Sequence, residues 1–172
     1  MATLFLIRHA EPVLKGVFLG QLDPPLSAAG RQQAARTLSE IEVCVTYSSP
    51  LQRARETASL IRSPQRIEVP GLREIDYGEW TGKSWVEIQL FWKELAADKC
   101  VDWLGVTVPG AEAWPDFVDR VRAAWQIIRT GHAPAAVVAH QGVNAALAHL
   151  ITAQDPLGFM QQHGEVIRVQ YD

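Results

Sequence analysis

Arginine and histidine side chains follow three of the most apolar runs of the sequence. Arg8 and His9 come directly after an apolar run near the N-terminus, and His140 comes directly after a second one. Arg53 lies in the first turns of a helical pattern that follows a third run. Because the carboxyl ends of parallel strands share one edge of a sheet, we expect these four side chains to meet there. Two imidazoles and two guanidiniums form a donor set that matches phosphate better than carboxylate.

A neutral histidine beside arginines is a nucleophile suited to phosphorus, and its reaction needs an acid to protonate the departing oxygen. The stretch "LREIDYGEW" contains three candidate carboxyl groups, Glu74, Asp76 and Glu79. A carboxyl group that aromatic residues shield from water has a raised pKa and can act as an acid near neutral pH. The residue types alone do not distinguish between the three.

Other interpretations of these residues stay open at this point. A single histidine at a strand end is more often a satisfied polar residue than a catalyst, and Arg53 also fits a solvated helix residue, as we expect Arg55 to be. We interpret His132, His149 and His163 as structural or surface residues. A metal site is disfavoured because the sequence has no H-E-x-x-H motif and no close Cys/His spacing, and Walker and dinucleotide-binding glycine motifs are absent too.

Apolar runs of strand length alternate with helical patterns along the whole chain. The strands are predicted at Thr3–Arg8, Val43–Tyr47, Ile67–Val69, Ala135–Ala139 and Val166–Tyr171. The helices are predicted at Ser27–Glu40, Pro50–Arg62, Lys83–Ala97, Trp114–Thr130 and Val143–Ala153. This alternation predicts an α/β fold, a three-layer α/β/α sandwich with a mainly parallel central sheet. In the second helix we expect Ser49 as the N-cap and Pro50 at the first helical position, with one apolar face formed by Leu51, Ala54, Ala58 and Ile61.

The chain is predicted to form a single domain over residues 1–172, because no linker or repeat divides it. The segment of about 75–114 differs from the rest and is interpreted as a helical insertion. It holds five of the six tryptophans, Trp80, Trp85, Trp92, Trp103 and Trp114. We expect most of them to pack in a core, with some facing a ligand cleft.

Composition excludes several classes of protein. Hydrophobic residues make up 48% and charged residues 20%, and the net charge is −3, so no basic field attracts nucleic acid or an anionic membrane. No run approaches the length of a membrane span, and no signal peptide is recognisable. Cys44 and Cys100 are far apart and are interpreted as buried, reduced thiols. These features predict a cytoplasmic protein that binds neither nucleic acid nor membrane.

Five blocks of the sequence resemble the histidine phosphatases, the phosphoglycerate mutase-like superfamily. In order, they read "LIRHAE", "GQLDPPLSAAGRQQA", "SSPLQRARETA", "LREIDYGEWTG" and "VVAHQGVNAAL". The resemblance implies that His9 attacks phosphorus and forms a phosphohistidine, and that Glu74 is the acid. It further implies that Arg8, Arg53, Gln141 and His140 surround the phosphoryl oxygens, and that no metal or organic cofactor takes part.

Departures from the family pattern concern substrate recognition rather than the chemistry. Ala10 stands where a glycine is common, and an asparagine often found some residues later is missing. Ala113 replaces the serine of the P-G-G-E-S block, and Gln141 replaces the glycine after the second histidine.

Within the family, the resemblance favours hydrolysis of a phosphomonoester over phosphoryl transfer, since 172 residues leave little room for the lid of a mutase. The run "EPVLKGVFLGQLDPPL" is similar to bacterial α-ribazole phosphatases of cobalamin synthesis. A small-molecule phosphate ester such as α-ribazole 5′-phosphate is therefore the expected substrate. A mutase-type phosphotransferase and a non-catalytic module that binds a phospholigand stay open as alternatives. The oligomeric state is open as well, with a homodimer among the options.

Overall fold

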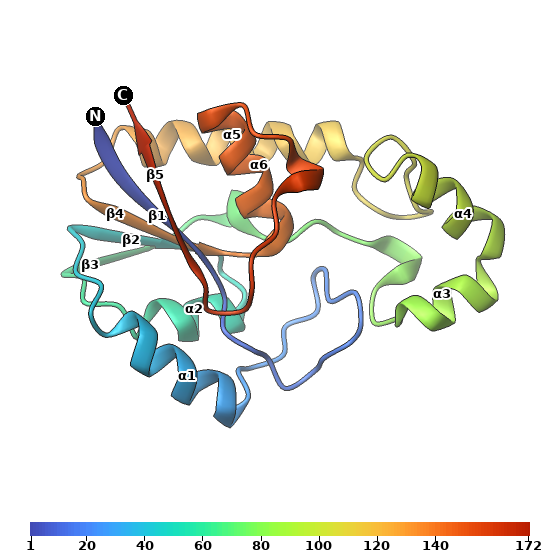
Figure 1. Ribbon diagram of the computed structural model, residues 1–172, viewed down its shortest axis with the longest axis horizontal. Helices are drawn as coiled ribbons and strands as arrows, with labels where there is room; N and C mark the ends of the chain where they lie inside the picture. The colour runs from blue at the N-terminus through green and yellow to red at the C-terminus, as the bar shows by residue number, and fades with distance from the viewer.

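A five-stranded sheet forms the centre of the protein, in a computed structural model that describes residues 1–172 (Figure 1). The strands lie in the order β3-β2-β4-β1-β5. Their bounds are β1 Ala2–Arg8, β2 Val45–Ser48, β3 Gln65–Glu68, β4 Ala135–Ala139 and β5 Val166–Tyr171. The first four of these in the spatial order pair in parallel, and β5 runs antiparallel to β1. The predicted mainly parallel sheet is confirmed.

Helices cover both faces of this sheet, which confirms the three-layer arrangement (Figure 1). One face carries α5 (Trp114–Arg129) and α6 (Gln141–Thr152), and the other carries α1 (Ala28–Leu38) and α2 (Gln52–Ala58). Ser27 caps α1, because its Oγ accepts a hydrogen bond of 2.9 Å from the backbone of Gly30. None of the helices combines the length and apolar character that crossing a membrane requires.

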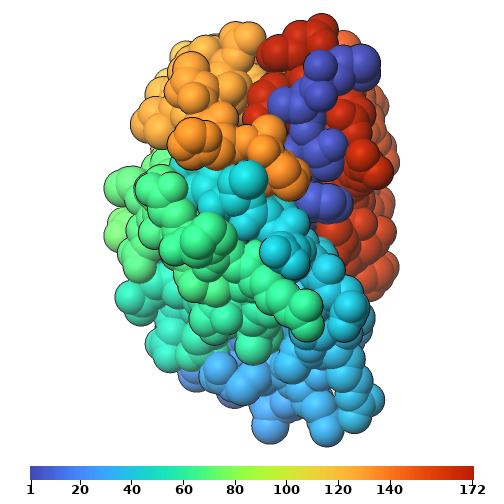
Figure 2. Space-filling model, turned by 90° about the vertical axis from the view of Figure 1, so that its left-hand side faces the viewer, coloured from blue at the N-terminus to red at the C-terminus, as the bar shows by residue number.

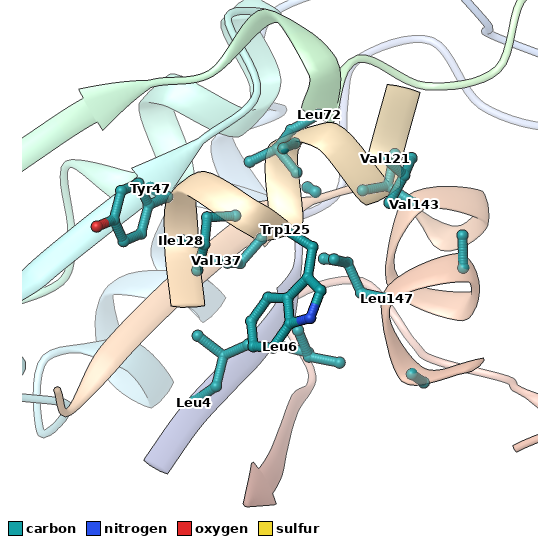
Figure 3. Packing of buried hydrophobic residues seen from close by; sticks show 14 of the residues in the cluster. Leu4, Leu6, Tyr47, Leu72, Val121, Trp125, Ile128, Val137, Val143 and Leu147 are labelled. Carbon is teal, nitrogen blue, oxygen red and sulfur yellow. The ribbon is translucent and has the colours of Figure 1, made fainter. Parts of the chain in front are cut away.

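Alternation along the strands decides which side chains enter each layer. Leu4 and Leu6 of β1 pack with Trp125 of α5 and Leu147 of α6 (Figure 3), whereas Ile7 packs against the α1–α2 layer. Successive residues of a strand point to opposite faces, so one apolar run supplies both cores. Truncation of a fully buried leucine in such a core costs roughly 2–5 kcal/mol of unfolding free energy.

The segment rich in tryptophan builds a smaller core of its own. It contains the 3-10 turn η2 (Gly78–Trp80), α3 (Trp85–Phe91) and α4 (Lys93–Val101). Trp80 is fully buried, and Phe18 from the N-terminal loop packs against the same cluster. The helix predicted over Lys83–Ala97 is in fact two helices, because the backbone leaves helical geometry at Trp92, with ψ near 45°. Two further 3-10 turns are η1 (Pro70–Leu72) and η3 (Pro156–Gly158).

Two further local predictions are wrong. Helix α2 begins at Gln52 rather than at Pro50, and its N-cap is Leu51. The buried Ser49 Oγ accepts from the backbone N–H of Leu51 at 3.2 Å, just before the helix begins, and also contacts His140. Cys44 and Cys100 are both exposed free thiols rather than buried ones. The contact between Ser49 and His140 and the exposure of the two thiols depend on tertiary packing, which local patterns do not report.

The parallel strands begin on the side of the molecule that Figure 2 shows. There the N-terminal residues, in blue, lie beside the C-terminal residues, in red, and Ala2 pairs with Tyr171. The opposite edge of the sheet is where β1, β4 and β2 end. Arg8, at the end of β1, and His9 and His140, directly after β1 and β4, lie there.

Candidate active site

The neighbouring strands β1 and β4 bring His9 and His140 together at this edge. Arg8 pairs with Ala139 in the parallel register, so the next residue of each strand is a histidine. The two imidazole centroids lie 5.1 Å apart, and both side chains are buried. The structure thus brings these two predicted site residues together.

The His9 imidazole is held in one tautomer. Its Nδ1 lies 2.8 Å from the carbonyl oxygen of Ala10 and therefore carries the proton and donates it to that oxygen. Burial, together with the positive charge of Arg53, holds the pKa of His9 well below its usual value. The imidazole is thus neutral, and the lone pair of Nε2 is available as a nucleophile.

The methyl group of Ala10, one of the departures from the family pattern, fits into the α1–α2 core. Its side chain is buried in the same cluster as Leu26 and Ala34. Its backbone N–H donates to Thr57 Oγ1 at 2.9 Å, and that hydroxyl donates to the carbonyl of Arg53 at 2.7 Å. This chain of bonds links the backbone beside His9 to helix α2.

Arg8 and Arg53 each keep part of their guanidinium free for a ligand. Arg53 is 1% exposed and donates to the carbonyls of Leu22 and Gly20, at 2.5 and 3.0 Å. Arg8 donates to the carbonyl of Gln161 at 2.7 Å. The Nε atoms of both arginines are buried without a hydrogen-bond partner. Arg55, in contrast, is exposed, as expected of a solvated helix residue.

Glu74 is the carboxyl group that enters this site. Its oxygens accept hydrogen bonds from the backbone N–H of Ile75 at 2.9 Å and of Gly142 at 3.3 Å. Burial raises the pKa of Glu74, although these two hydrogen bonds and the charges of Arg53 and Arg8 partly offset it. A carboxyl group with a raised pKa can carry a proton closer to neutral pH.

The other two candidate acids are engaged elsewhere. Asp76 accepts from the backbone N–H of Gly78 at 2.9 Å, and Glu79 accepts from the indole of Trp92 at 3.2 Å. Neither lines the cavity that contains His9. The structure therefore separates Glu74 from its two neighbours, which the residue types could not do.

Arg120 fixes the backbone that carries Glu74. Its guanidinium donates to the carbonyls of Gly71, Arg73 and Glu74, at 2.8 to 3.0 Å. It also forms an ion pair of 2.6 Å with Glu112, the acidic residue of the "PGAEA" block. Sequence reasoning overlooked Arg120 because nothing in its local pattern distinguishes it from a solvated helix residue.

His140 and Gln141 stand at the start of α6. His140 Nε2 hydrogen bonds with Ser49 Oγ at 2.9 Å, while its buried Nδ1 has no partner. The Gln141 amide donates to the carbonyl of Phe159 at 2.6 Å and accepts from the backbone of Gln161 at 3.1 Å. Its side chain is thus tied to the C-terminal loop, and only its backbone N–H, in the first turn of the helix, is left to contact an anion.

His163 also lies at the site, contrary to its interpretation as a structural or surface residue. Its ring centroid is 5.2 Å from that of His9. It precedes β5, and because β5 is antiparallel to β1, the start of β5 lies where β1 ends. The expectation that site residues follow the carboxyl ends of strands did not cover His163, which precedes a strand.

The catalytic cavity has a volume of about 500 Å³. Its lining includes Arg8, His9, Arg53, Glu74 and His163. A second cavity of about 220 Å³ adjoins it and shares Tyr77 and Gln141 as walls. No group of three or more His, Cys, Asp or Glu side chains is arranged to hold a metal ion.

Sequence comparisons find several known proteins to which this chain is similar. The chain is 35% identical to "Putative phosphoserine phosphatase 2" of Hydrogenobacter thermophilus, over 88% of this chain and 79% of that protein. It is 30% identical to the "Adenosylcobalamin/alpha-ribazole phosphatase" of Escherichia coli, over 84% and 76%. It is also 30% identical to a 2,3-bisphosphoglycerate-dependent phosphoglycerate mutase of Bartonella henselae, over 70% and 68%.

A solved structure has the same fold. The α-ribazole phosphatase of Shigella flexneri superposes with a TM-score of 0.84 at 27% identity, covering 99% of this chain and 91% of that one. The chain also matches the family described as "Histidine phosphatase superfamily (branch 1)" over residues 4–172. With the paired histidines and the two arginines at the sheet edge, these matches show that the protein is a phosphatase and belongs to the histidine phosphatase superfamily.

Proposed function

We propose that the protein is a metal-independent phosphomonoesterase that acts through a phosphohistidine on His9. The observation that carries this proposal is the neutral His9 imidazole, whose Nδ1 is bonded to Ala10 and whose Nε2 is free, beside the buried Arg53 and the half-buried Arg8. Arg8 and Arg53 offset the charge of the phosphoryl oxygens, and His140 and the backbone N–H of Gln141 add neutral donors.

The reaction runs in two steps on this set of residues. In the first, His9 Nε2 forms a bond to phosphorus while the ester P–O bond breaks, and Glu74 gives its proton to the departing oxygen. In the second, a water molecule attacks phosphorus, gives a proton to Glu74, and the N–P bond breaks to release phosphate. Proton transfer of this kind contributes roughly 10²- to 10⁴-fold to rate.

Glu74→Gln tests the acid role directly. Hydrolysis of an alkyl phosphate should slow about 10²-fold or more, whereas p-nitrophenyl phosphate, whose leaving group needs little protonation, should slow far less. Steady-state kinetics on both substrates measures the difference. Equal losses on the two substrates would remove Glu74 from this role.

We further propose α-ribazole 5′-phosphate as the substrate, a nucleotide with a flat bicyclic base. The second cavity supports this choice because Trp80, Trp103, Trp114 and Phe159 line it, beside the wall it shares with the catalytic cavity. Flat apolar rings bind well between such side chains. Phosphoserine, the substrate that one relative's name suggests, has a small charged leaving group that would gain nothing from this cavity.

A substrate panel decides between the two. α-Ribazole 5′-phosphate, O-phosphoserine and p-nitrophenyl phosphate should be assayed in EDTA, with the highest kcat/KM expected for the first. Ala145→Leu places a larger side chain in the wall of the second cavity and reduces its free space. It should therefore selectively slow the reaction with α-ribazole 5′-phosphate. Ala123→Leu, on the exposed side of α5, is the matched control. A preference for phosphoserine in the unmodified enzyme would reject the substrate proposal.

The alternatives predict different fates of the phosphoryl group. A mutase-type phosphotransferase would transfer the phosphoryl group of a labelled substrate to an added phosphoglycerate acceptor faster than to water. A non-catalytic module would bind phosphate without becoming phosphorylated. Acid-labile phosphate on a histidine, lost in His9→Ala and kept in His132→Ala, is expected of the phosphatase. Full activity in His9→Ala would reject the proposed mechanism.

A further inference from the structure

His163 flanks His9 on the side opposite to His140. Strand β1 lies between β4, which ends at His140, and β5, which begins shortly after His163. The ring of His9 is therefore 5.1 Å from one imidazole and 5.2 Å from the other. His9 thus has an imidazole on each side; His163 lines the cavity with it, and the proposed reaction does not use His163.

The loop that carries His163 is firmly attached to the elements of the site. The N–H of Gly164 donates to the carbonyls of Arg8 and His9, at 3.0 and 3.3 Å. The buried Gln161 side chain donates to the carbonyl of Leu6 at 2.9 Å and accepts from Asn144 of α6 at 2.8 Å. The imidazole of His163 is thus held beside β1 by bonds on both sides of it in the chain.

The His163 ring is available to a ligand. It is half-buried, it lines the catalytic cavity, and neither of its nitrogens forms a hydrogen bond within the protein. Burial and the facing charges of Arg8, Lys15 and Arg53 lower the pKa of His163 to about 4, and Glu11 opposes them. At neutral pH the ring is therefore uncharged and carries one N–H donor.

In-line attack determines which part of a substrate this donor meets. The leaving oxygen lies opposite the attacking Nε2 of His9, on the side of Glu74, whereas a group beside the His9 ring faces the nonbridging oxygens. We propose that His163 donates a hydrogen bond to a nonbridging oxygen of the phosphoryl group bound at His9. This assignment rests on the proposed reaction at His9, and it makes His163 a phosphate ligand rather than a proton donor to the leaving group.

Orthovanadate and inorganic phosphate are suitable probes, because each presents the same set of oxygens without a leaving group. His163→Ala should weaken inhibition by both roughly 10- to 100-fold, as expected for loss of a hydrogen bond to a charged group. It should lower kcat/KM for alkyl and p-nitrophenyl phosphates by the same factor. His163→Asn keeps an N–H donor and should recover most of the affinity, and His132→Ala, at an exposed histidine, should behave as the unmodified enzyme.

Several results would overturn this role. One is unchanged vanadate inhibition in His163→Ala. Another is a loss of kcat/KM confined to alkyl phosphates. A third is a His163→Asn variant whose anion affinity is no higher than that of His163→Ala. If His163→Ala fails to fold, His163→Leu and His163→Asn provide the same comparison. Failure of the reaction at His9 would appear separately, as an absence of phosphohistidine in the unmodified enzyme, while anion affinity would still report on His163.

Discussion

Gly142 offers a sensitive test of how closely the site is packed around Glu74. It is the second residue of α6, and a Cβ built on it would lie 2.6 Å from Glu74 Oε1. Ordinary contact begins at 3.4 Å, so Gly142→Ala requires the carboxyl group to move by about 0.8 Å. Phe117 lies 3.5 Å from the same Cβ and limits how the methyl group can be accommodated.

This displacement should impair catalysis more than stability. A shift of about 1 Å in a catalytic group can cost on the order of 10²-fold in rate, and alanine in place of glycine favours a helix by about 1 kcal/mol. We therefore expect kcat for alkyl phosphates to fall about 10²-fold, with a much smaller loss for p-nitrophenyl phosphate. Thermal unfolding should stay close to that of the unmodified protein.

Steady-state kinetics on both substrates, with a melting curve for each variant, checks this expectation. Gly158→Ala is the matched control, since a Cβ at that glycine meets nothing within 4 Å. If Gly142→Ala hydrolysed alkyl phosphates at the original rate, Glu74 would not be the acid, or its position would not matter. That result would refute the reasoning under both explanations.

Three further predictions concern the surroundings of the site. Ser49→Ala leaves the buried Nε2 of His140 without its partner, so kcat/KM should fall roughly 10-fold. Arg120→Met releases the backbone of Glu74, and urea titration should show a loss of roughly 2 kcal/mol, with alkyl phosphates affected most. Burial holds the pKa of His9 and His140 well below 6.5, so the unfolded chain binds protons that the folded protein does not. Unfolding free energy should therefore fall as pH drops below about 6.5, by up to about 1.4 kcal/mol per pH unit for each imidazole, and the raised pKa of Glu74 opposes only part of this. Equal stability at pH 7 and pH 5 would contradict the burial of the two imidazoles.

Local sequence patterns predicted the strands well because a buried strand is a short apolar run whatever surrounds it. The runs before His9 and His140 are such cases, and the parallel edge then brings the two histidines together. Helix ends were less predictable. The hydroxyl of Ser49 accepts from the backbone N–H of Leu51 ahead of α2, and it also contacts His140, a contact that depends on how β2 and β4 pair.

By itself the sequence determined the α/β layering and the kind of chemistry, since periodicity and residue type are local properties. It named His9, Arg53 and His140 without any knowledge of distance. Only the tertiary structure decided which carboxyl group is buried beside the arginines, what Gln141 and Arg120 hold, and that His163 stands next to His9. Those outcomes depend on burial and on partners from distant segments, because a side chain's pKa and its free hydrogen-bonding positions are set by whatever packs around it.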